Sequence, residues 1–185
     1  MAEKAHRTGN LSPEYVLLGF LIIKPSHGYD LHQRFIAELG YVWHLSQSQT
    51  YAILKRLQDH GDISTQVVEQ EKLPSRQMLR VTASGRRRFL EWLELGVGKN
   101  ARSIRLEFLT RLYFAQLLRP ESIGRIYDAQ AAEIGSAIAR LESLVKQVPP
   151  EQAFNRLSID LRFRQLQLIQ NWMAELRTEF HIPAY

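Results

Sequence analysis

The change of sequence pattern at Gly61 constrains the fold of this chain more than any other feature. Before it, Ser46 is followed three residues later by a glutamine, a combination that caps helix N-termini, and the glycine itself favours a helix end. After it, β-branched residues alternate from Ile63, and a second extended run at 77–81 follows a proline-containing loop at 71–76. The sequence therefore predicts a capped helix that leads directly into a two-stranded hairpin.

Two more helices are expected before this one. Apolar residues occupy nearly every face from 14 to 23, behind Ser12 as the N-cap and a proline at the first helical position, so this first helix should be buried. The second has a leucine or phenylalanine at every fourth position up to Leu39 and should end at Gly40. The segment 25–30 between the two helices is predicted to be a turn.

A fourth helix is expected after the hairpin. Thr82 has the residue type favoured at an N-cap, and the helical pattern continues to about Leu95. Three helices, a hairpin and a further helix make the layout of a winged helix-turn-helix, in which one helix enters the major groove of DNA. We therefore expect residues 1–95 to form a mainly α domain with a small β-hairpin wing.

The chain beyond a linker-like segment at 95–101 is almost wholly helical in pattern. Helices are predicted over 105–118, 121–147 and 151–180. The second of them has apolar residues with the alternating three- and four-residue spacing of a coiled coil. They are Tyr127, Ala131, Ile134, Ile138, Leu141, Val145 and Val148.

The last of these helices has apolar residues on two roughly opposite faces. One stripe consists of Ile159, Phe163, Leu166, Ile169, Met173, Leu176 and Phe180, and the other of Leu157, Leu161, Leu168 and Trp172. A helix with two apolar faces needs two partners, which we expect to be the preceding helix and a second copy of the chain. Residues 102–185 are thus predicted to form a helical, coiled-coil-like dimerisation domain. The predicted contacts of the homodimer are Leu157, Leu161, Phe163, Leu166, Leu168, Trp172 and Met173.

The polar face of the third helix provides the candidate binding site. Ile53, Leu54 and Leu57 lie on one side of the helical wheel, opposite a small, polar and cationic face. Such residues suit contacts with phosphates and guanine in the major groove, although a solvated helix face has the same residue types. The candidate DNA contacts on this helix are Ser48, Thr50, Tyr51 and Lys55. On the hairpin, Lys72 and Arg76 are placed to reach phosphates or the minor groove.

Several classes of function are disfavoured by the composition. The chain has no cysteine, so disulfides and thiolate metal sites are excluded. Its six histidines lack metal-ligand spacing, and we find no phosphate-binding glycine loop, nucleophile elbow or paired-carboxylate motif. We therefore expect no enzyme, no metal and no cofactor. The longest apolar run, Val16–Ile23, is about half the length of a membrane span, so a cytoplasmic protein is expected.

Four segments of the chain resemble the PadR family of transcriptional regulators. They are HGYDL at 27–31, SQTYAILKRLQDHGDI at 48–63, LRVTASGRR at 79–87 and RLEFLTRLYFA at 105–115. The long helical tail and the stretch ELGYVWHLSQ are similar to the virulence-activator branch of that family. The resemblance implies a winged helix-turn-helix protein, a homodimer through the C-terminal helices, and operator binding. Of the two possible actions on transcription, which the sequence does not decide, we expect repression. The tyrosine and lysine that commonly contact DNA in the family match Tyr51 and Lys55, whereas the wing EKLPSRQMLRV lacks the family's glycine and tyrosines.

Two alternatives remain open at this level. Some family members respond to small aromatic ligands, which implies an effector pocket between the two halves of the chain. Its candidate residues are Trp92, Phe108, Tyr113, Phe114 and Trp172, although the same aromatics would equally fill a hydrophobic core. A winged helix can also act as a protein–protein interaction module without direct DNA readout, and the basic hairpin argues mildly against this.

Overall fold

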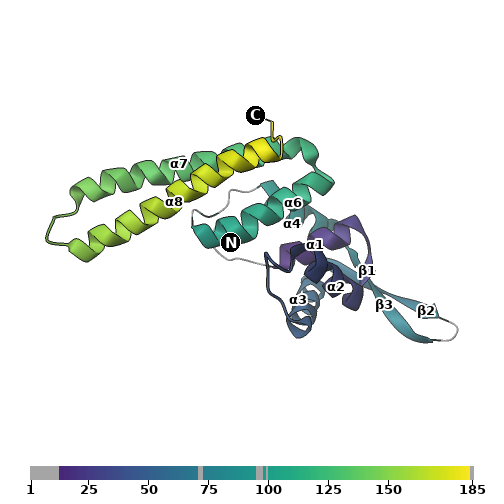
Figure 1. The fold of residues 1–185 in the computed structure, drawn as a ribbon. Helices are drawn as coiled ribbons and strands as arrows, with labels where there is room; N and C mark the ends of the chain where they lie inside the picture. The colour runs from purple at the N-terminus through teal and green to yellow at the C-terminus, as the bar shows by residue number, and fades with distance from the viewer. Residues whose placement is uncertain (1–12, 71–72, 95–97, 99, 184–185) are drawn as a thin grey trace, which may run out of the picture. The chain divides into compact units, whose positions relative to one another are not determined.

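The computed structural model describes residues 13–70, 73–94, 98 and 100–183 (Figure 1). These residues fall into two compact units, one that ends at Glu94 and one that begins at Gly98. Within the described part of the chain, no helix has both the length and the apolar character needed to cross a membrane.

The N-terminal unit contains helices and one small antiparallel sheet. Its elements are α1 (Glu14–Ile23), β1 (Ser26–His27), α2 (Gly28–Leu39), α3 (Gln47–Asp59), β2 (Ile63–Gln70), β3 (Leu73–Val81) and α4 (Ala83–Glu94). The strand order is β1-β3-β2, so β3 is the central strand (Figure 1). The mainly helical, winged fold class expected from the sequence is confirmed.

The core of this unit is built around α1, as its apolar sequence predicts. All residues from Tyr15 to Leu21 are buried. Around them lie Leu31 and Phe35 of α2 together with Phe89 of α4, each at most 1% exposed. A fully buried side chain of this size contributes roughly 1.5–3 kcal/mol by leaving water, so these contacts hold the helices together.

The capping signals around α3 are confirmed. The Ser46 hydroxyl accepts a hydrogen bond from the Gln49 amide at 3.2 Å, and the Gln49 side chain accepts one from the Ser46 amide at 2.8 Å. At the other end, Gly61 has a φ of 73°, a left-handed conformation that glycine adopts without strain. The chain can therefore leave α3 and enter β2 within three residues.

The wing is longer than the sequence predicts. Backbone pairing continues from Ile63 opposite Val81 to Gln70 opposite Leu73, so the prediction of a loop over 71–76 is wrong from Leu73 onward. Among the described strands, β3 pairs with β1 only at Met78 and Leu79. The proline that suggested a loop therefore lies where β3 has a single neighbouring strand, a position that tolerates proline.

The short strand β1 is the element that the sequence does not predict. The segment 25–30 was expected to be a turn, but Ser26 and His27 pair with Leu79 and Met78, and α2 begins at Gly28. The imidazole Nδ1 of His27 also lies 3.0 Å from the carbonyl oxygen of Gln77. These contacts satisfy backbone groups on the outer side of β3, and they join the start of α2 to the base of the wing.

The C-terminal unit consists of helices. One continuous helical segment is made of α5 (Ala101–Ser103), the π-helical turn η1 (Ile104–Phe108) and α6 (Leu109–Leu118). It begins four residues before the helix that the sequence predicts over 105–118. The short 3₁₀ segment η2 (Pro120–Ser122) leads into α7 (Ile123–Gln147), and α8 (Ala153–Glu179) returns beside it (Figure 1). The predicted stripe on α7 is confirmed as a packing face, because none of its seven residues is exposed.

Candidate nucleic-acid interface

The two faces of α3 are separated as the helical wheel predicts. Ile53, Leu54 and Leu57 are at most 4% exposed and pack into the N-terminal core. On the other side, Ser48 and Lys55 are exposed. The surface of α3 thus offers a hydroxyl and a cation at one helical face, with spacing suited to a DNA groove.

Tyr51 lies at the edge of this face, against the start of α2. A Cβ atom at Gly28 would lie 2.8 Å from Cε1 of Tyr51, so the glycine allows the ring to pack on the helix backbone. The tyrosine still keeps 46% of its surface exposed. It therefore combines an anchored ring with an accessible part that a partner can contact.

A hollow of about 500 Å³ lies beside Tyr51 and Lys55. It is lined by residues from α2, α3 and the base of the wing, namely His27, Gly28, Tyr29, Asp30, Tyr51, Leu54, Lys55, Gln58, Gln77 and Leu79. Sequence reasoning found two of these residues, because it did not foresee that β1 brings α2 and the wing together. The exposed face of α3 is thus part of a concave surface.

Thr50 is not available to a partner, and it is removed from the candidate DNA contacts. Its side chain is fully buried, and its hydroxyl donates to the Ser46 carbonyl oxygen at 3.1 Å. The hydroxyl oxygen of Thr50 also lies 2.9 Å from Nδ1 of the buried His32. A hydroxyl has a single proton, so the imidazole N–H donates to Thr50. The sequence held a signal for this, since Thr50 is seven residues before Leu57 and shares its side of the helix.

We expect Thr50→Val to destabilise the protein by about 1–3 kcal/mol. Valine keeps the shape of the side chain but removes the hydroxyl, which leaves the His32 ring nitrogen buried without its partner. Urea unfolding measures the change in free energy. The matched control is Ser84→Ala, which removes a hydroxyl from an exposed position of α4 and should change stability by no more than about 0.5 kcal/mol. Equal stability of Thr50→Val and the wild type would show that the His32 bond contributes nothing.

The predicted wing contacts remain predictions. Lys72 lies outside the described residues, and only the backbone of Arg76 is described, where it pairs with Val68. Arg80 is an exposed cation on the described part of β3. The wing therefore presents at least one positive charge near its base.

The residues predicted for dimerisation divide between the two faces of α8. Leu157, Leu161 and Leu168 are 61%, 58% and 71% exposed. In contrast, Leu166 and Met173 are 6% and 2% exposed, because they belong to the stripe that packs inside their own unit. Phe163 and Trp172 are half-buried. Of the residues predicted for dimerisation, the three leucines are therefore accessible on the surface of α8.

The aromatic residues proposed for an effector pocket make ring contacts within their own units. In the N-terminal unit, Trp92 stacks on Tyr15 with ring centroids 4.6 Å apart. In the C-terminal unit, Phe108 is fully buried and meets Trp172 edge-on at 6.5 Å. Tyr113 packs edge-on against the buried Phe114 at 4.9 Å, and it also lines a cavity of about 250 Å³. The other residues that line this cavity are Leu109, Leu112, Gln116, Ile123, Leu176, Phe180 and Ile182.

Known proteins that are similar to this chain include transcriptional regulators. Residues 17–91 match the model of the transcriptional regulator PadR-like family. The chain is 27% identical over 129 residues to the negative transcriptional regulator PadR of Bacillus subtilis, and the match covers 70% of each chain. It is also 27% identical over 79 residues to the probable transcriptional regulator Rv1176c of Mycobacterium tuberculosis, which covers 43% of this chain and 42% of that one.

A solved structure of Bacillus subtilis PadR in complex with operator DNA is similar with a TM-score of 0.45 and 22% identity. That similarity covers 90% of this chain and 97% of the other. The virulence-activator branch, in contrast, stays a prediction. The segment that matches the family contains α3, the wing and most of α4. Residues 17–91 of the chain are thus similar to the PadR-like family of transcriptional regulators.

Proposed function

We propose that the protein is a homodimeric transcriptional regulator that binds operator DNA with α3 and the wing, and that it acts as a repressor. The observation that carries the proposal is the exposed face of α3 with Ser48, Tyr51 and Lys55, inside a unit that is similar to the PadR-like family. The relative from Bacillus subtilis is named a negative regulator, which supports repression over activation. An operator-binding role also fits the cytoplasmic location expected from the sequence.

The proposed contacts follow from the chemistry of the exposed groups. Lys55 offers three N–H donors, which suit phosphate oxygens or the acceptor edge of guanine. The half-packed ring of Tyr51 keeps its side chain in place, so its hydroxyl would reach a phosphate with little loss of conformational entropy. Lys72 and Arg76 would add phosphate contacts from the wing. In this arrangement α3 supplies sequence preference and the wing supplies general affinity.

Residues 102–185 are proposed to form the dimerisation domain. The exposed leucines of α8 support this, because a row of apolar side chains in water favours burial against another apolar surface. A two-fold dimer would present two recognition helices to two half-sites of an operator. The effector pocket stays a prediction from the family resemblance.

Lys55→Ala is expected to weaken operator binding by about 1–3 kcal/mol if the lysine reads a base, with a relaxed preference at that position. If the lysine meets only a phosphate, affinity should fall equally on all duplexes. Tyr51→Phe removes one hydroxyl and should cost about 1 kcal/mol of binding. The probe is an operator selected from random duplex DNA with the wild-type protein. Titrations at several salt concentrations measure the affinity and its dependence on salt.

The matched control for the charge is Lys146→Ala, which removes an exposed lysine from α7. It should leave operator affinity nearly unchanged. Should both Tyr51→Phe and Lys55→Ala bind like the wild type, α3 does not read DNA. A wild-type protein that binds no duplex with a salt-dependent affinity would instead favour the protein–protein interaction module.

A further inference from the structure

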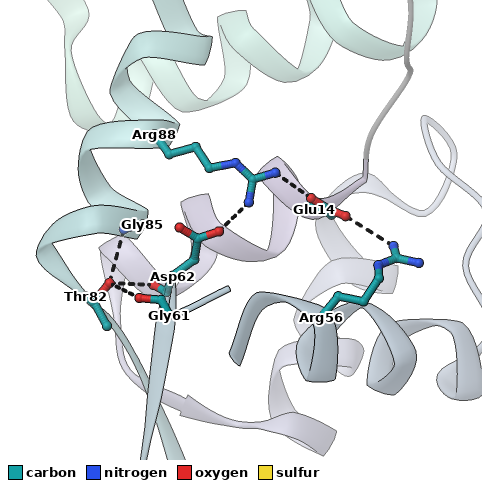
Figure 2. A network of polar contacts seen from close by, with 7 residues as sticks. All are labelled: Glu14, Arg56, Gly61, Asp62, Thr82, Gly85 and Arg88. Carbon is teal, nitrogen blue, oxygen red and sulfur yellow. Dashed lines mark hydrogen bonds and ion pairs between the residues drawn. The ribbon is translucent and has the colours of Figure 1, made fainter. Parts of the chain in front are cut away.

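Four charged residues of the N-terminal unit form one connected network (Figure 2). The guanidinium of Arg88 donates to Oε2 of Glu14 at 2.7 Å, and it also donates to Oδ2 of Asp62. The other carboxylate oxygen of Glu14 lies 3.2 Å from a guanidinium nitrogen of Arg56. The network thus runs Asp62, Arg88, Glu14, Arg56, with two positive and two negative charges in alternation.

The inner part of this network is shielded from water and the outer end is not. The side chains of Asp62 and Glu14 are 5% and 14% exposed, and that of Arg88 is 27% exposed. Arg56, in contrast, is 56% exposed. Burial alone would lower the pKa of Arg88, but the hydrogen bonds to Glu14 and Asp62 outweigh it and raise that pKa above its ordinary value. Arg88 therefore stays charged and paired with both carboxylates, and Arg56 is the accessible end of the network.

The backbone around Asp62 fixes the inner end to α4. The Thr82 hydroxyl lies 2.7 Å from the carbonyl oxygen of Gly61 and 3.1 Å from that of Asp62, and it accepts a bond from the Gly85 amide at 3.1 Å (Figure 2). A Cβ atom at Gly85 would collide with the Asp62 carbonyl oxygen, so the first turn of α4 approaches the end of α3 closely. Arg88 lies one turn further along α4, so the same contact also fixes the position of its backbone.

The outer end of the network holds one flank of the recognition helix. At 100° per residue, Arg56 and Tyr51 lie about 140° apart, with the exposed face of Ser48 and Lys55 between them. The Tyr51 flank packs on the start of α2, and the Arg56 flank is tied to Glu14 at the start of α1. Rotation of α3 about its axis would break the pair with Glu14 and would also redirect Ser48 and Lys55.

The geometry points to Glu14 as a positioning residue of the recognition helix: held by Arg88, its carboxylate keeps Arg56 in place and thereby sets the rotation of α3 in the groove. Glu14 itself does not touch DNA in this arrangement. The inference rests on the proposed function, because it assumes that α3 reads DNA. It identifies a residue outside the recognition helix that controls specific binding.

Glu14→Gln tests this inference, because loss of positioning and simple electrostatics predict opposite changes in operator affinity. The substitution removes a negative charge, so simple electrostatics predicts equal or tighter binding of every duplex. Loss of positioning predicts that operator binding weakens by roughly two- to fivefold, the range that partly exposed ion pairs contribute. Random duplex DNA should meanwhile be bound as well as before, so the ratio of specific to non-specific affinity falls. Glu91→Gln is the matched control, since it removes an exposed carboxylate from α4 and should leave that ratio unchanged.

A double-mutant cycle with Arg56→Gln separates positioning from general stability. In the Arg56→Gln background, Glu14→Gln should no longer reduce operator affinity, because the link that it cuts is already absent. The melting temperatures of all variants are measured first, and the titrations are carried out at a temperature at which every variant is folded. Operator binding by Glu14→Gln that equals or exceeds the wild type overturns the inference, and so does an equal loss in both backgrounds. Absence of duplex binding by the wild type would instead overturn the proposed function.

Discussion

Replacing Leu161 and Leu168 together by glutamate is expected to abolish the proposed dimer and to leave a monomer. These leucines are 58% and 71% exposed, and their seven-residue spacing places them on one face of α8. In a two-fold dimer the double variant would bury four carboxylates in an apolar interface, and each unpaired buried charge costs several kcal/mol. Sedimentation equilibrium at micromolar concentration measures the loss of the dimer directly.

Operator affinity should fall with the dimer. When two recognition helices are linked, the second half-site is bound at high effective concentration, and loss of that linkage weakens binding by roughly 10²–10⁴-fold. The matched control is Gln167→Glu with Ala174→Glu, which has the same spacing and charge at exposed positions about a third of a turn away. This control should remain dimeric and bind normally. A dimeric Leu161→Glu, Leu168→Glu protein would place the interface elsewhere.

Local signals account for the parts of the fold that the sequence predicts well. The boundaries of α3 follow from Ser46, Gln49 and Gly61, whose effects act within a few residues. The two faces of α8 likewise follow from the helical period alone, since Ile159, Leu166, Met173 and Leu176 of one stripe are buried and the leucines of the other are exposed. Such features need no knowledge of what lies far along the chain.

The remaining features depend on contacts between distant residues. The two-residue strand β1 exists because Ser26 and His27 meet β3 about fifty residues later, and no local pattern marks so short a strand. Thr50 has the polarity of a DNA contact, yet His32 on the preceding helix makes it an internal hydrogen-bond partner. The site residues Gly28 and Gln77 were missed for the same reason, since their place beside Tyr51 is set by the pairing of β1 with β3.

The ion network is the clearest case of such a long-range feature, because Glu14 and Arg88 are 74 positions apart. From the sequence, Glu14 has the position of a helix-dipole partner and Arg88 that of a surface cation in a basic run. Only the packing of α1 against α4 brings them together. The structure thus assigns a shared role to two residues for which local patterns give separate and weaker ones.

Arg88→Met is expected to reduce the free energy of unfolding by about 3–5 kcal/mol, because it leaves two carboxylates without their shared cation. Glu14 and Asp62 are 14% and 5% exposed, so water screens their repulsion poorly. Methionine retains most of the aliphatic volume of Arg88 but removes its guanidinium, whose carbon lies 5.3 Å from the centroid of the Tyr15 ring. Urea unfolding followed by circular dichroism provides the measurement.

Two further variants decide whether charge is the cause of this loss. Arg87→Met removes the exposed neighbouring cation and should change stability by no more than about 0.5 kcal/mol. Asp62→Asn in the Arg88→Met background removes a carboxylate that has lost its cation, so it should recover part of the lost stability, whereas in the wild type it should be destabilising. This reversal of sign is specific to an ion pair, since loss of packing alone would make the two substitutions additive. Additive effects would therefore show that Arg88 stabilises the unit through its aliphatic contacts instead.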